Sequence, residues 1–237
     1  MTVCLLADIP VAFVHRYPHF AEVFAAYRTD LAPALTVSVT EGELTAEAKR
    51  NPALPPPALE LRALYRKFIA TLPAYGGFFL HAAFFTVDGY GIAVCAKSGV
   101  GKSTHVALWR DLFSERVRII NGDKPLIRRR EDGLFLGYGT PMAGKEGWQE
   151  NTAAPVRAVL FLARAEEDRV SPLTATEAFP LLLSALPPAE RSEDLSALLP
   201  LTSEFLSSVR LFRAEVTPRL PAAALAYRAI LEKEISV

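Results

Sequence analysis

One short segment constrains the fold of this chain more than any other: Ala96-Lys97-Ser98-Gly99-Val100-Gly101-Lys102-Ser103-Thr104. It follows the pattern Gly-x-x-x-x-Gly-Lys-Ser/Thr at every position except the first, where Ala96 replaces glycine. An apolar strand-like segment precedes it, and a helix is expected from about Lys102 to Phe113. In that order of elements, glycines let backbone N–H groups curl around phosphate oxygens, and the first helical turn adds unpaired N–H groups. The segment therefore predicts a phosphate loop.

The residue types within the loop indicate what it binds. Lys102 is expected to reach the β- and γ-phosphates, and the Ser103 hydroxyl to ligate Mg²⁺. Thr104 would lie near the α-phosphate. We therefore predict a nucleoside triphosphate, ATP with Mg²⁺, held by the whole segment from Ala96 to Thr104.

A phosphate-loop enzyme also needs a carboxylate that orients Mg²⁺ or takes a proton from the acceptor. Asp123 is the best candidate, because it follows the strand expected after the phosphate-loop helix and so lies at the same edge of the sheet. The alternative is that Asp123 is an ordinary turn residue within Asn121-Gly122-Asp123.

Turn signals around the loop predict a mixed sheet. Asp88-Gly89 joins the expected strands 78–87 and 90–96 as a hairpin, and Glu131-Asp132-Gly133 joins a second one. We therefore expect an α/β fold in which antiparallel pairs accompany the phosphate-loop strand. The triplet Pro55-Pro56-Pro57 reads as a connector. It divides a small N-terminal α+β segment, 1–57, from the phosphate-loop domain, 58–237.

Charge and cysteine content exclude several classes of function. The 26 basic and 26 acidic residues cancel, so nothing indicates nucleic-acid binding or an acidic membrane surface. Residues 68–87 carry no formal charge, but they include Pro73 and two adjacent glycines, and their second half fits a strand rather than a membrane helix. The two cysteines, Cys4 and Cys95, form no metal pattern, and a reducing cytoplasm fits best.

These motifs together resemble the catalytic domain of HPr kinase/phosphorylase and, more distantly, phosphoenolpyruvate carboxykinase. The similar stretch runs from about His81 to Ala163. It is still more similar to short bacterial HPr-kinase-like proteins in its segments Ser98–His105, Asn121–Pro125 and Gly139–Lys145. The resemblance implies the mixed-sheet fold of those kinases, and it implies a kinase that transfers the γ-phosphoryl group of ATP to a hydroxyl group. The acceptor would be a serine of a protein or peptide, or a small molecule. HPr kinases assemble into oligomers, so a homo-oligomer is implied as well.

The resemblance also bears on single residues. It places His81 near the transferred phosphate, although a lone histidine in an apolar strand is more often a core residue. Gly122 stands where HPr kinases carry the first of two acidic residues, so Asp123 would have to act alone or with His81. Lys145 lies on a glycine-containing loop, where it either neutralises charge on the phosphoryl group or is simply solvated.

The leading hypothesis is a kinase with Asp123, His81, Lys102 and Lys145 as catalytic residues and with Ser103 and Asp123 as metal ligands. Two alternatives remain open at this level. One is an NTPase, or a phosphorylase that runs the reverse reaction. The other is a nucleotide-sensing module without catalysis, which the glycine at position 122 favours.

Overall fold

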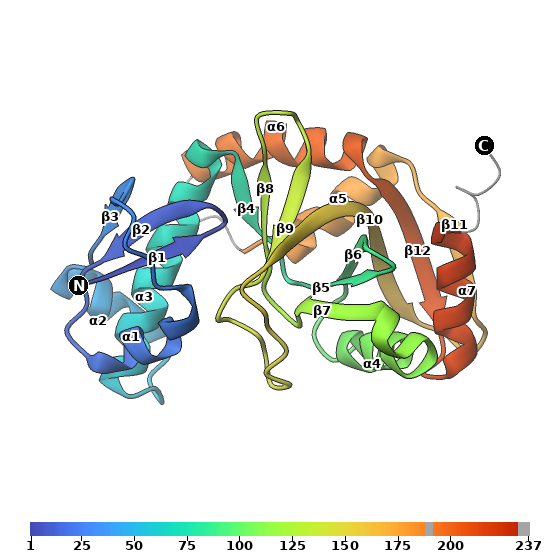
Figure 1. The fold of residues 1–237 in the computed structure, drawn as a ribbon, viewed down its shortest axis with the longest axis horizontal. Helices are drawn as coiled ribbons and strands as arrows, with labels where there is room; N and C mark the ends of the chain where they lie inside the picture. Colours follow the sequence, from blue (N-terminus) through green and yellow to red (C-terminus); the bar gives the residue numbers. More distant parts are fainter. Residues whose placement is uncertain (188–191, 232–237) are drawn as a thin grey trace. The chain divides into compact units, whose positions relative to one another are not determined.

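The chain folds as two units, Met1–Tyr75 and Gly76–Val237, in a computed structural model that describes residues 1–187 and 192–231 (Figure 1). The division expected after residue 57 therefore differs from the observed one. Helix α3 (Pro56–Thr71) belongs to the first unit, and Pro56 and Pro57 form its first turn instead of a connector. Proline is tolerated there because the first N–H groups of a helix have no intrahelical partner.

The first unit is α+β. Its sheet has the order β1-β2-β3, with β1 and β2 antiparallel and β3 parallel to β2. Helix α2 is fixed by a capping box in which Thr40 and Glu43 bond each other's backbone N–H. Stacked and tilted aromatic rings of Phe13, Phe20 and Phe24 fill the core. The elements besides α3 are β1 (Thr2–Leu6), β2 (Ile9–Phe13), α1 (Pro18–Val23), β3 (Leu35–Val37) and α2 (Glu41–Arg50).

The second unit contains a mixed sheet, as predicted. The strand order is β4-β8-β9-β10-β6-β5-β7, with β12 also beside β10 and β11 beside β12. The pairs β6/β10 and β10/β12 are parallel, whereas the other pairs are antiparallel. The strands are β4 (Gly77–Phe79), β5 (Ala82–Val87), β6 (Tyr90–Cys95), β7 (Val117–Asn121), β8 (Leu126–Arg129), β9 (Phe135–Tyr138), β10 (Ala153–Arg164), β11 (Arg169–Pro172) and β12 (Arg210–Val216).

Both predicted hairpins are present. Strands β5 and β6 turn at Asp88 and Gly89, whose φ angles of 51° and 80° are those of the turn that Asp-Gly favours. Strands β8 and β9 pair antiparallel around Glu131–Gly133. The hairpin β5/β6 therefore leads directly into the 96–104 segment, as the sequence indicated.

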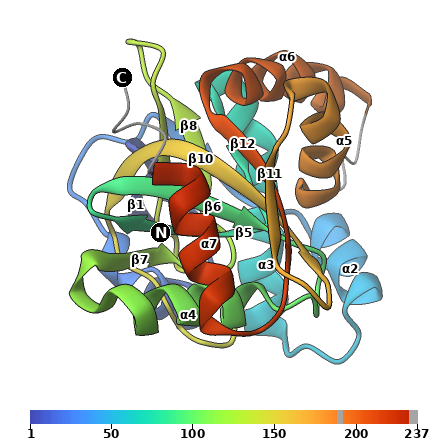
Figure 2. The ribbon, with the colours of Figure 1, turned by 90° about the vertical axis from the view of Figure 1, so that its right-hand side faces the viewer.

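Neighbouring residues of a strand point to opposite faces of the sheet. Both faces of this sheet carry apolar side chains, and helices cover each of them. Phe84 packs in the apolar cluster that includes Leu182 and Phe205, on the side of α5 (Ala175–Ala185) and α6 (Ser192–Ser208). Phe85 packs with Trp109 on the opposite side. That side is covered by α4 (Lys102–Phe113) and α7 (Leu220–Leu231), which contact each other (Figure 2).

The prediction of a single strand over residues 78–87 is wrong. The structure has β4 and β5 instead, separated by Leu80 and His81. Strand β4 pairs with β8, whereas β5 pairs with β6 and β7, so the chain must change partners between them. In the described parts of the chain, no helix has the length and apolarity needed to cross a membrane.

Candidate active site

The predicted phosphate loop connects the end of β6 at Cys95 to the start of α4 at Lys102. Gly99 and Gly101 have φ angles of 80° and 110°, which residues with a side chain rarely adopt. The Val100 N–H bonds the Lys97 carbonyl at 3.2 Å, and the His105 N–H bonds the Gly101 carbonyl at 2.9 Å. The loop thus turns tightly and leads into the N-terminus of α4, where the first backbone N–H groups have no intrahelical partner. This arrangement is suited to binding an anion.

Asp123 lies directly opposite the lysine of this loop. Its Oδ1 atom is 3.1 Å from Lys102 Nζ and also 3.1 Å from His81 Nε2. Its Oδ2 atom is 3.7 Å from Lys124 Nζ. Three of the predicted site residues, from separate segments of the sequence, therefore meet at one carboxylate oxygen.

The charges around Asp123 keep its carboxyl ionised. Partial burial by itself would raise the pKa of Asp123, but the hydrogen bond from His81 and the positive charges of Lys102 and Lys124 outweigh it. The net result is a pKa well below the usual range. Asp123 is therefore available as an anion at any physiological pH, either to hold a cation or to accept a hydrogen bond from a hydroxyl.

Asn121, at the end of β7, orients Asp123. Its Oδ1 accepts the backbone N–H groups of Asp123 at 3.0 Å and Lys124 at 2.6 Å. Its Nδ2 donates to the carbonyl and to the hydroxyl of Thr140, at 3.0 and 3.2 Å. Thr140 Oγ1 in turn donates to the Lys124 carbonyl at 2.8 Å. Because Asn121 and Thr140 are fully buried, this network fixes the turn that carries Asp123. In the sequence, Asn121 is distinguished only as part of the Asn121–Pro125 segment.

The change of strand partners explains how His81 reaches the site. The Leu80 N–H bonds the Pro125 carbonyl at 3.2 Å, and the Ala82 N–H bonds the Asp123 carbonyl at 3.1 Å. His81 therefore sits between two backbone contacts to the segment that contains Asp123. Its side chain is 37% exposed, so it is not the satisfied core histidine that an uninterrupted strand would have produced.

The loop between β9 and β10, residues 139–152, closes beside the same carboxylate. We call it the lysine loop because it carries Lys145. The Gly122 N–H bonds the Trp148 carbonyl at 2.8 Å, which ties the loop to the end of β7. Gly144, with φ 76°, is so close to Asp123 that a Cβ atom on it would be 2.9 Å from the Asp123 Cβ. Lys145 itself is exposed, and no ion pair joins it to Asp123 in the described residues.

Gly122 is closely packed against the lysine loop. A Cβ atom there would lie 3.1 Å from the Ala143 carbonyl oxygen and 3.3 Å from the Trp148 Cβ. Both neighbours belong to the lysine loop, so a side chain at this position would require that loop to give by a few tenths of an ångström.

The donors available for Mg²⁺ are hard oxygen atoms. Ser103 is the second residue of α4, and the Asp123 carboxylate faces Lys102, the first residue of the same helix. Within residues 1–187 and 192–231, no group of three or more His, Cys, Asp or Glu side chains could hold a metal ion by itself. Ser103 and Asp123 offer two protein oxygens. This number suits Mg²⁺, which keeps several bound waters and also takes substrate phosphates as ligands. It does not suit a metal ion whose ligands all come from the protein.

His105 does not belong to this site. It is 2% exposed, and its Nε2 accepts the Trp109 Nε1–H at 3.1 Å. Burial lowers its pKa to about 4, so the ring is neutral at physiological pH. His105 therefore packs in the interior against Trp109.

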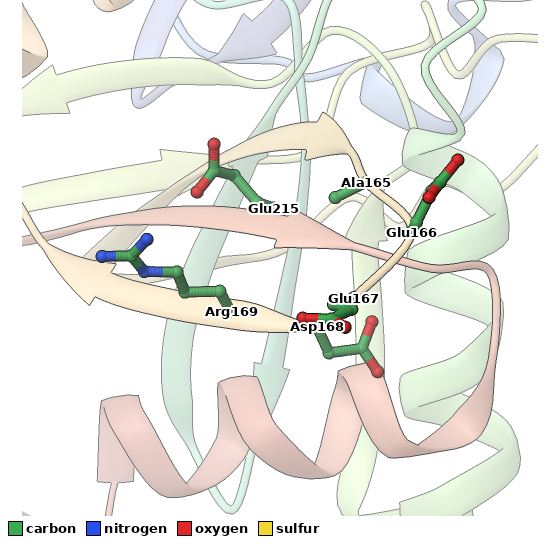
Figure 3. Close-up of a pocket in the computed structure, with 6 residues that line it drawn as sticks. All are labelled: Ala165, Glu166, Glu167, Asp168, Arg169 and Glu215. Atoms are coloured by element: carbon green, nitrogen blue, oxygen red, sulfur yellow. The ribbon is translucent and has the colours of Figure 1, made fainter.

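An open depression of about 720 Å³ lies along the turn between β10 and β11 (Figure 3). The turn contributes Glu166, Glu167 and Asp168, and β12 contributes Glu215. Asp168 accepts the Thr217 N–H at 2.6 Å. Arg169 also lines the depression, but the four carboxylates outnumber it, so this surface is poorly suited to phosphate groups.

Comparisons with known proteins add little to this geometry. No protein-family model matches the chain, and no curated protein does. Among solved structures, it is similar to the Hpr(Ser) kinase/phosphatase from Coxiella burnetii, with a TM-score of 0.39 and 13% identity over 67% of this chain and 93% of that chain. A match of this size carries no inference about activity, so the function has to be inferred from the site itself.

Proposed function

We propose that this chain is an ATP- and Mg²⁺-dependent phosphotransferase that moves the γ-phosphoryl group to a hydroxyl group of a protein, a peptide or a small molecule. The observation that carries the proposal is the meeting of Lys102 and His81 at one oxygen of Asp123, beside a glycine loop that opens a helix. An anion-binding helix start and an ionised carboxylate within reach of it are the two parts that phosphoryl transfer requires.

The triphosphate would displace Asp123 as the partner of Lys102. The Lys102 side chain is 10% exposed and begins at the first residue of α4, so its ammonium group would turn from Asp123 to the β- and γ-phosphate oxygens. The N–H groups of Gly101 and of the first turn of α4 would bind the same phosphates. Bound Mg²⁺ would neutralise phosphate charge, with Ser103 and Asp123 as its protein ligands.

Release of Lys102 would not leave Asp123 without a positive charge beside it. Bound Mg²⁺ would take the place of the lysine, so the carboxylate would stay ionised and could accept a hydrogen bond from the acceptor hydroxyl. His81 would stay bonded to Oδ1 and keep the carboxylate oriented, while the acceptor hydroxyl would donate to the other oxygen. The hydroxyl proton would pass to the Asp123 carboxylate as the oxygen attacks phosphorus and ADP leaves. Lys145, on the loop that closes beside Asp123, would stabilise charge on the transferred group.

The proposal is tested with γ-labelled ATP and a cell extract separated into protein, peptide and metabolite fractions. We expect label in one fraction with the unaltered protein, and a loss of at least about 100-fold with Asp123→Asn. Lys102→Ala should abolish both labelling and ATP binding. Gln149→Ala, an exposed amide on the lysine loop, serves as the matched control and should label normally.

The other functions predict different results. An NTPase would release ADP at the same rate with and without an acceptor fraction. The nucleotide-sensing module, which the single carboxylate next to a crowded Gly122 favours, would bind ATP without any turnover. Absence of label from every fraction, together with normal ATP binding, would overturn the kinase. Release of ADP would then favour the NTPase, and its absence would favour the sensor.

A further inference from the structure

Arg164 is bonded to the predicted phosphate loop, although it is far from the loop in sequence. Its Nε donates to the Val100 carbonyl at 2.9 Å, and its Nη2 donates to the Gly99 carbonyl at 2.6 Å. The guanidinium group thus spans two successive carbonyls with two parallel donors, which is the fork geometry that arginine offers and lysine does not.

Arg164 is anchored on a central strand. Strand β10 runs parallel to β6 up to the pair Phe161 and Cys95, and then continues past the end of β6 to Arg164. On its other side, Arg164 pairs with Val216 of β12. The backbone of Arg164 is therefore held by the sheet while its side chain reaches the loop, so a rigid element supports a segment that contains two glycines.

These bonds determine where the loop points its N–H groups. The C=O and N–H of a planar trans peptide point in opposite directions. The peptide with the Gly99 carbonyl carries the Val100 N–H, which closes the turn to Lys97. The peptide with the Val100 carbonyl carries the Gly101 N–H. Because Arg164 draws both carbonyls to one side, the Gly101 N–H is directed to the other side of the loop.

We propose that Arg164 is a positioning residue of the nucleotide site, which holds two peptide planes of the loop so that the Gly101 N–H is oriented for a phosphate oxygen before ATP arrives. The inference rests on the proposed function. Without Arg164, Gly99 and Gly101 sample more backbone conformations, and that freedom is lost when the phosphates bind. The side-chain bonds of Arg164 go to carbonyls of the loop and not to Asp123, so we expect it to act on nucleotide binding and not on the transfer step.

The test compares Arg164→Ala and Arg164→Lys with the unaltered protein by calorimetric titration with ATP and Mg²⁺. We expect the Kd to rise about tenfold for the alanine variant and about threefold for the lysine variant, which can reach one carbonyl at a time. The KM for ATP should rise in parallel, while kcat stays within about twofold. Arg129→Ala removes an exposed arginine paired with Glu204 in the same unit, and it should leave the Kd unchanged.

Hydrogen exchange provides a readout that needs no nucleotide. Amides 98–102 should exchange faster in Arg164→Ala than in Arg129→Ala, while the strands of the sheet keep their protection. An Arg164→Ala variant with unchanged Kd and unchanged exchange refutes the positioning role and leaves the proposed function intact. A fall in kcat at constant KM also refutes it. If the unaltered protein binds no ATP, the proposed function fails, and the role of Arg164 fails with it.

Discussion

Removal of the Asn121 side chain should both destabilise the second unit and abolish the orientation of Asp123 in the candidate site. In Asn121→Ala, the buried Thr140 carbonyl loses its donor, and the N–H groups of Asp123 and Lys124 lose their acceptor. An orphaned buried acceptor costs about 1–3 kcal/mol. The two N–H groups belong to half-buried residues that water can reach, so they add only about 0.5 kcal/mol each. The expected loss of stability is therefore about 3 kcal/mol.

Urea unfolding followed by tryptophan fluorescence measures this loss directly. The chain has two tryptophans, Trp109 and Trp148, and both lie in the second unit, so the signal reports the unit that contains Asn121. Gln149→Ala is the matched control, because Gln149 faces Asn121 across a β-bridge but has an exposed side chain. It should change the unfolding free energy by less than about 0.5 kcal/mol. If Asn121→Ala behaves like the control, Asn121 does not hold the Asp123 turn.

Three further predictions concern the surroundings of Asp123. First, the folded-state pKa of Asp123 lies below its ordinary value of 3.8, so the unfolded chain binds the proton more readily. The free energy of unfolding should therefore fall as the pH drops below about 4. In Asp123→Asn, acid unfolding should show a smaller dependence of this free energy on pH in the same range. Second, Gly144→Ala combines a positive φ with a clash against the Asp123 Cβ, and it should cost about 1–2 kcal/mol and lower the rate of transfer more than Gly147→Ala, where nothing lies within 4 Å. Third, Gly122→Asp should lower the free energy of unfolding of the second unit by about 1–3 kcal/mol in urea, because the side chain displaces the lysine loop. The rate of phosphoryl transfer should fall as well. A higher rate would contradict this packing.

The sequence was most informative where local chemistry decides the structure. The glycines of the 96–104 segment require a turn, and helix α4 begins and ends at the predicted residues. The Asp88-Gly89 hairpin follows from the φ angles that those two residues tolerate. The position of Asp123 followed from strand order alone, and the structure brings it within 3.1 Å of Lys102. Its role as base and metal ligand stays a prediction.

Features that depend on distant contacts could not be read from local patterns in the sequence. His81 lies in an apolar run that looks like one strand, and only the separate pairing of β4 and β5 turns its ring to Asp123. Asn121 and Arg164 act through carbonyls 19 and 64 residues away, which no local pattern indicates. Helix α2 was missed for another reason: its apolar stripe is weak, although Thr40 and Glu43 have the spacing of a capping box and could have revealed it.

The most direct test of the central claim is a crystal structure of the protein with Mg²⁺ and a non-hydrolysable ATP analogue. We expect a triphosphate curled into residues 97–104, with Lys102 Nζ moved from Asp123 to the β- and γ-phosphate oxygens and with the Asp123 carboxylate beside the metal. A nucleotide bound elsewhere, or an unchanged Lys102–Asp123 pair beneath a bound triphosphate, would contradict it.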